Sequence, residues 1–75
     1  MSSLPVVSGR ECVNALQQAG FILTRQRGSH IILCRAAPYA QVVIPDHKEL
    51  DRETLRGILR HAQMDVEEFL LLLRR

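Results

Sequence analysis

The chain has 75 residues, of which 47% are apolar, and a formal net charge of +2. This length fits one domain, and the apolar fraction excludes an intrinsically disordered chain. The longest apolar run, residues 69–73, is too short to cross a bilayer, and the mildly basic pI near 8.9 is only weak evidence for an anionic partner.

The first part of the sequence predicts a leader followed by an amphipathic helix. Residues 1–6 are expected to be a flexible leader, without the apolar segment of a secretory signal. Ser8, followed three residues later by Glu11, forms a capping-box signature. Apolar residues then recur at helical spacing as far as Ala19, and Gly20 supplies the left-handed residue that ends a helix.

The middle of the sequence predicts three short strands. They are rich in β-branched and aliphatic residues and are expected at residues 21–25, 29–35 and 41–44. Turns are expected at residues 26–28 and 36–39, and Pro45 ends the third strand because it cannot donate to a ladder. Turns this short join antiparallel neighbours, so the strands form a meander.

Two helices are predicted in the last third. Asp51 can cap one over residues 52–62, and Asp65, with Glu68 three residues later, can cap the other over residues 66–74. The order α-β-β-β-α-α predicts an α+β fold, in which helices cover one face of a three-stranded antiparallel sheet. Double-stranded-RNA-binding domains have this topology, although a fold alone does not assign a function.

The most informative segment is residues 25–30, which place several reactive or phosphate-binding groups around one hairpin turn. The guanidinium groups of Arg25 and Arg27 match phosphate oxygens, and Gly28 allows a substrate backbone to approach closely. Ser29 adds a hydroxyl, and His30 adds an imidazole, the side chain most often used to give or take a proton in catalysis. RNA carries its own nucleophile in the 2′-hydroxyl, so this chemistry does not require a metal ion.

Other interpretations of these residues stay open. Arginine-rich turns are usually solvated surface, and a histidine at a strand start is more often a surface residue than a catalyst. His47 could be a second site residue, although a local hydrogen bond is the commoner role, and a cationic His61 suits the end of a helix. No pair among His30, Cys34, His47 and Cys12 has the usual zinc spacing, so we expect two reduced cytoplasmic thiols.

Both faces of the second predicted strand are apolar in the middle. His30 shares one face with Ile32 and Cys34, while Ile31 and Leu33 share the other. Helices can cover only one of these faces. We therefore expect a partner or a loop to cover part of the open face.

Several segments, in this order and spacing, resemble the HicA toxin family. They span nearly the whole chain and include residues 4–11, 19–21, 25–30, 42–45, 54–56, 58–60 and 66–69, with His47 and residues 49–50 after the third strand. Gln63 departs from the resemblance, because the family usually has glycine between its last two helices. A left-handed glutamine costs about 1 kcal/mol, so we expect this turn to differ.

The resemblance implies a domain over residues 1–75 with a fold like that of double-stranded-RNA-binding domains. It implies a toxin of a type II toxin–antitoxin system, acting in the cytoplasm as an endoribonuclease that needs no metal or other cofactor and cleaves messenger RNA. The family's catalytic histidine corresponds to His30, with Gly28 and Ser29 beside it. We expect Arg25, Arg27 and Lys48 to help bind the RNA.

The resemblance also implies a HicB-type antitoxin that blocks the active site, and no direct contact with DNA or a membrane. Two alternatives remain open. One is a module of the same fold that binds RNA without cutting it, and the other is a regulatory protein whose only ligand is another protein.

Overall fold

The computed structural model describes residues 3–74, and their secondary structure follows the predicted order. The elements are α1 (Gly9–Gln18), β1 (Ile22–Arg27), β2 (His30–Ala36), β3 (Tyr39–Pro45), α2 (Arg52–Ala62) and α3 (Val66–Leu73). The strands form one antiparallel sheet in the order β1-β2-β3, so β2 is central and the other two are edges. The predicted α+β fold is confirmed.

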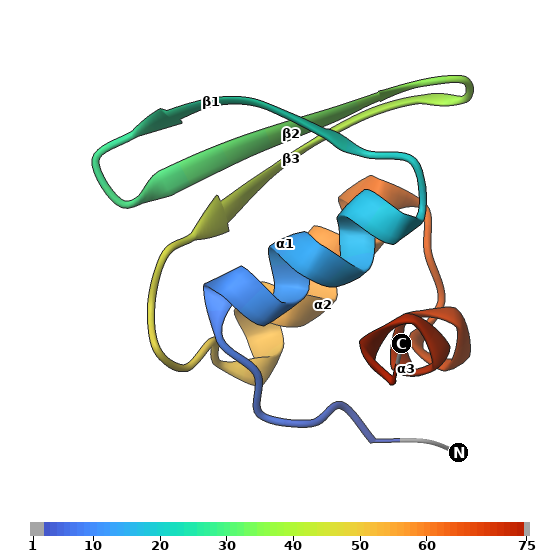
Figure 1. Cartoon of the computed structure of the whole chain (residues 1–75). Helices are drawn as coiled ribbons and strands as arrows, with labels where there is room; N and C mark the ends of the chain where they lie inside the picture. The colour runs from blue at the N-terminus through green and yellow to red at the C-terminus, as the bar shows by residue number, and fades with distance from the viewer. Residues whose placement is uncertain (1–2, 75) are drawn as a thin grey trace.

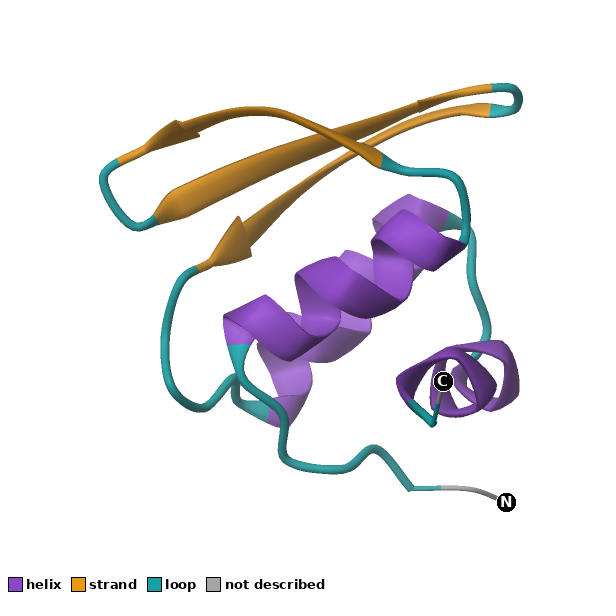
Figure 2. Cartoon of the chain, in the orientation of Figure 1, coloured by secondary structure: helices purple, strands orange, loops and turns teal. Residues whose placement is uncertain are grey.

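The helices all lie on one side of the sheet (Figure 1). α1 and α2 pack beneath β3, and α3 packs against α1. Within residues 3–74, no helix or loop crosses the face of the sheet that points away from the helices, as Figure 2 shows. No helix within residues 3–74 is long and apolar enough to cross a membrane.

The core lies between the sheet and the helices. Alternate residues of the two longer strands point into it, namely Ile31 and Leu33 from β2 and Ala40, Val42 and Ile44 from β3. The helices contribute side chains with the same low exposure, among them Cys12, Leu16, Leu55 and Phe69. This strict alternation on β3 is what a sheet with one covered face requires.

The N-terminal segment departs from the flexible leader expected over residues 1–6. Residues 1–2 lie outside the described part of the chain, but Leu4 is only 2% exposed and belongs to the core. Its carbonyl oxygen accepts a hydrogen bond from Nε of Arg52, at 3.2 Å. The apolar side chain therefore anchors the segment that enters α1.

The predicted helix caps are present. The Ser8 hydroxyl accepts from the Glu11 N–H, and the Glu11 carboxylate accepts from the Ser8 N–H, which confirms the capping box. Asp51 accepts from the backbone N–H of Thr54 at 2.7 Å, and this bond lowers the pKa of the Asp51 carboxyl. Asp65 caps α3 in the same way.

The turn after α2 is an outcome that the sequence did not predict. Gln63 adopts the left-handed conformation, with φ 59° and ψ 43°, so the expected change of turn is wrong. Arg35 holds this turn in place, because its Nη2 donates to the Ala62 carbonyl at 3.2 Å and to the Gln63 side chain at 3.3 Å. The Arg35 guanidinium also lies 4.7 Å from the centre of the Phe21 ring.

Two glycines make a matched test of this packing. A Cβ added at Gly9 would overlap the carbonyl oxygen of Pro45, whereas one added at Gly57, inside α2, would meet only Nη2 of Arg60 at 3.8 Å. We expect Gly9→Ala to lower the free energy of unfolding by about 1–3 kcal/mol. Gly57→Ala should raise it by roughly 0.5–1 kcal/mol through helix propensity. Urea titrations followed by circular dichroism measure both, and shifts of the same sign would contradict the packing described.

The two cysteines should differ sharply in reactivity. Cys12 is fully buried, and this burial raises the pKa of its thiol to about 12, whereas Cys34 is partly exposed. Because the thiolate is the reacting species, a thiol reagent should modify Cys34 quickly in the native protein and Cys12 only on unfolding. Cys34→Ser should therefore show no fast labelling, and fast labelling of that native variant would place Cys12 outside the core.

Candidate functional site

His30 is the first residue of β2 and stands between two neighbours in the sheet. It lies opposite Arg27 of β1 and opposite Pro45 of β3. Residues directly opposite in an antiparallel pair share a face, with Cβ atoms about 4.5–5.5 Å apart. Arg27 and His30 are therefore side by side on the uncovered face, and both are exposed to solvent.

A β-bulge determines which side chains of β1 join them. Leu23 pairs with Leu33, but the next pair is Arg25 with Ile32, so Thr24 is an extra residue in the ladder. The Thr24 hydroxyl donates to the Ile32 carbonyl at 3.1 Å. Strict alternation from the outward-facing Ile22 would turn both arginines of β1 toward the helices, and the extra residue reverses this phase.

This arrangement was not predicted from the sequence. The first strand was expected to end at Arg25, with Arg27 in the turn, whereas β1 continues to Arg27. The arginine in question is thus a strand residue, held directly across from His30. The bulge adds only one residue, Thr24, and threonine is common in regular strands. The sequence therefore contains no signal that a bulge is present.

We use the name open face for the outward side chains of the three strands. By the register they are Ile22, Arg25, Arg27, His30, Ile32, Cys34, Ala36, Tyr39, Gln41, Val43 and Pro45. None of the eight acidic residues of the chain lies in a strand. The open face therefore has cationic groups at one end, apolar and amide groups at the other, and no carboxylate.

The turn that joins Arg27 to His30 consists of Gly28 and Ser29. Gly28 has φ +58°, and a glycine of this kind at the first position of a two-residue hairpin loop is a feature of type II′ turns. A Cβ added there would meet nothing within 4 Å, so the backbone conformation and not space requires glycine. The turn leaves the approach to His30 open.

An ion pair ties this end of the sheet to the helix layer. Arg10 binds both carboxylate oxygens of Asp46, with distances of 3.1 and 3.0 Å, and the Asp46 N–H donates to the Ser29 carbonyl at 2.6 Å. The Gln26 amide donates to the Gly28 carbonyl at 3.1 Å and to Asp46 at 3.5 Å. A cation in the first turn of a helix opposes the helix dipole, so the position of Arg10 in the sequence is itself a signal that its side chain has an acidic partner.

Lys48 and His47 lie on the loop that leads from β3 to α2. The Gly9 N–H donates to the His47 carbonyl at 2.9 Å, and the Leu50 N–H donates to the Val7 carbonyl at 2.8 Å. These bonds hold the loop against the N-terminal segment. The structure therefore gathers Arg25, Arg27 and His30 on strands of one face, while Lys48 and His47 stand on a loop beyond its edge.

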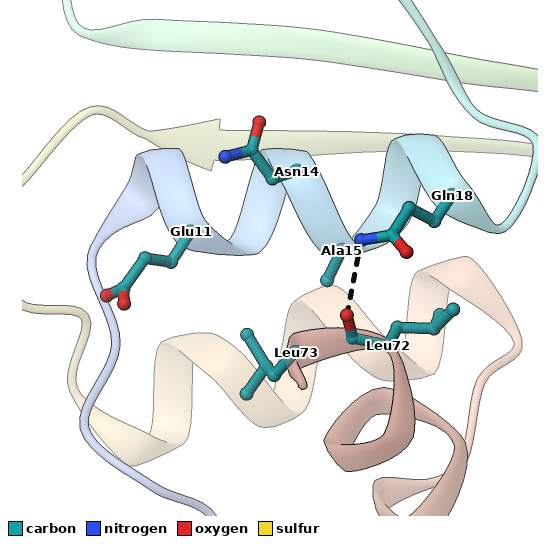
Figure 3. Close-up of a pocket in the computed structure, with 6 residues that line it drawn as sticks. All are labelled: Glu11, Asn14, Ala15, Gln18, Leu72 and Leu73. Carbon is teal, nitrogen blue, oxygen red and sulfur yellow. Dashed lines mark hydrogen bonds between the residues drawn. The ribbon is translucent and has the colours of Figure 1, made fainter. Parts of the chain in front are cut away.

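The remaining candidates lie elsewhere. His61, near the C-terminal end of α2, borders a groove between α2 and the edge of β3. A second groove, shown in Figure 3, separates α1 from α3. It is lined by Glu11, Asn14, Ala15, Gln18, Leu72 and Leu73, and the Gln18 amide donates to the Leu72 carbonyl at 3.2 Å. His30 lines neither of these two grooves.

The chemistry available around His30 is that of an exposed imidazole beside guanidinium groups. Across residues 3–74, no hydrogen bond or ion pair engages the His30 side chain. The same range holds no group of three histidine, cysteine or acidic side chains close enough to bind a metal ion. Such a site can bind phosphate through the arginines and transfer a proton through the imidazole.

Comparison with known proteins identifies the family. No curated protein matches the chain. The sequence profile described as the HicA toxin of bacterial toxin–antitoxin matches residues 9–64, which run from the start of α1 through the whole sheet and α2. Because this match covers most of the 75 residues, the chain belongs to the HicA toxin family of bacterial toxin–antitoxin systems.

Proposed function

We propose that this toxin is a metal-independent endoribonuclease that cleaves messenger RNA, with His30 as its catalytic side chain. The observation that carries the proposal is the placement of an exposed imidazole directly across from Arg27, on a face without carboxylates. A polyanion is attracted to such a face and finds no like charge on it. RNA is the polyanion that can be cleaved by proton transfer alone.

In the proposed reaction the 2′-hydroxyl oxygen of the RNA attacks the adjacent phosphorus, and the bond to the 5′-oxygen breaks. The products are a 2′,3′-cyclic phosphate and a 5′-hydroxyl, so one proton leaves the 2′-hydroxyl and one reaches the leaving oxygen. His30 moves one of these two protons, and solvent water accepts or supplies the other. Arg25 and Arg27 stabilise the negative charge that develops on the phosphate oxygens. Gly28 and Ser29 let the RNA backbone come close to the turn, and Lys48 attracts the RNA from the neighbouring loop.

We further propose that a HicB-type antitoxin controls this activity in the cytoplasm, where messenger RNA is translated. The toxin–antitoxin family implies an antitoxin partner. Several apolar side chains of the open face are exposed, including Val43 in its middle and Ile22 toward the end away from His30. An antitoxin that covers this face would block access to His30.

Removing the imidazole tests the nuclease directly. His30→Ala should lower the rate of cleavage of an RNA transcript in EDTA by about 10²- to 10⁴-fold, the usual contribution of a general acid or base. The fold should survive, because the side chain is exposed. His61→Ala, which removes an exposed histidine from α2, is the matched control and should cleave at the parent rate. Parental cleavage by His30→Ala would show that the imidazole is not catalytic.

The arginines of β1 can be tested through the salt dependence of binding. Arg25→Ala and Arg27→Ala should each weaken RNA binding and reduce the slope of log affinity against log salt by about one phosphate contact. Arg56→Ala, an exposed arginine on α2, is the control and should leave the slope unchanged. If the slopes of log affinity against log salt for Arg25→Ala and Arg27→Ala equal that of Arg56→Ala, the RNA binds elsewhere on the protein.

One observation favours the non-catalytic alternative. A catalytic histidine is often oriented by a third group, whereas no described residue hydrogen-bonds to the His30 side chain. A module that binds RNA without cutting it needs no such group. Intact RNA in a salt-sensitive complex with metal-stripped wild-type protein would favour this module over the nuclease.

A further inference from the structure

We propose that the open face holds a second contact for single-stranded RNA, a base-stacking site formed by Tyr39 at the end away from His30. This inference rests on the proposed function, because it assumes that RNA is the polyanion bound at the cationic end. It adds a contact with a base to the contacts with the phosphates.

Tyr39 is unusual among the aromatic residues of the chain. The sequence contains one tyrosine, two phenylalanines and no tryptophan. Phe21 and Phe69 are buried in the core, whereas Tyr39 is 65% exposed. The one exposed aromatic ring thus stands on the face that also carries His30, although burial elsewhere would have stabilised the fold more.

The surroundings of this ring suit a nucleobase. A shallow apolar hollow beside it is lined by Ile22, Thr24, Cys34, Arg35, Ala36 and Tyr39. The Tyr39 hydroxyl donates to Oε1 of Gln41 at 3.1 Å, and the Cys34 thiol donates to the same oxygen at 3.8 Å. These bonds position the Tyr39 ring and leave the Gln41 NH₂ group to donate to the polar edge of a base.

Charge and spacing favour RNA over a protein as the occupant. The open face has no carboxylate, and its other end carries Arg25, Arg27 and His30. Tyr39 precedes Pro45, the partner of His30, by six positions on β3, so about 20 Å separates the two ends at roughly 3.3 Å per residue. A strand of a few nucleotides can span this distance, with phosphates at one end and a base on the ring.

The protein contains its own probe for this contact. The chain has one tyrosine and no tryptophan, so the intrinsic tyrosine fluorescence of the protein comes from the Tyr39 ring. Stacking of a base on the ring should quench this fluorescence. The titrant is an octamer of uridylate with 2′-O-methyl groups, which removes the nucleophile and prevents cleavage. An abasic octamer of equal charge is the control. We expect saturable quenching by the uridylate octamer and none by the abasic one.

Variants then distinguish base stacking on Tyr39 from nonspecific binding to exposed apolar side chains. Tyr39→Ala should weaken binding of a fluorescein-labelled octamer by about tenfold, as expected for the loss of one stacked base. Tyr39→Phe, which keeps the ring but loses the hydrogen bond to Gln41, should weaken binding much less. Leu71→Ala, on α3 and 64% exposed in the wild type, is the matched apolar control and should have no effect. Unchanged affinity of Tyr39→Ala, equal quenching by both octamers, or no binding of the octamer would overturn the proposal.

A parallel cleavage assay distinguishes this inference from the proposed nuclease. Octamer binding that depends on Tyr39, without cleavage of a transcript, would support the stacking site and refute the nuclease. If the transcript is cleaved but octamer binding does not depend on Tyr39, only the stacking site is refuted. If a protein partner shields Tyr39 while RNA leaves its emission unchanged, the hollow is a protein interface, and the proposal is overturned.

Discussion

The candidate site depends on the register between β1 and β2. Thr24 adds one residue to the ladder, so both arginines of β1 face the same way as His30. A side-chain period of two means that a one-residue shift moves a whole strand segment to the opposite face. Without the bulge, both arginines would point to the opposite side of the sheet from His30. The cationic end of the open face is therefore a consequence of one extra residue.

Two arginines fasten the sheet to the helices, one at each end. Arg10 binds Asp46 next to the turn that carries His30, and the Asp46 backbone holds Ser29. Arg35 binds the C-terminal end of α2 at the opposite end of β2 and stacks on Phe21. Both pairs use the planar fork of guanidinium, which fixes direction as well as distance. Because residues far apart in sequence meet there, they hold the sheet at a set angle above the helices.

The two faces of the sheet have separate roles. The inner face supplies buried aliphatic residues to the core, and the open face has the exposed cations, the amide of Gln41 and the Tyr39 ring. A small domain has little surface to divide between stability and binding. Successive residues of β2 and β3 alternate between the core and the open face. Substitutions on the open face can therefore change binding while the core stays intact.

The sequence by itself determined the order of elements, the helix caps and the division of β2 into two faces, because hydrophobic periodicity and capping are local properties. It also singled out His30 and its neighbours as the candidate site. Only the tertiary structure decided that Arg25 and Arg27 share a face with His30, that Arg10 binds Asp46, that Gln63 keeps a left-handed turn beside Arg35, and that Leu4 is buried. Each of these depends on strand register or on contacts between residues distant in the chain, and periodicity along a sequence contains no information about either.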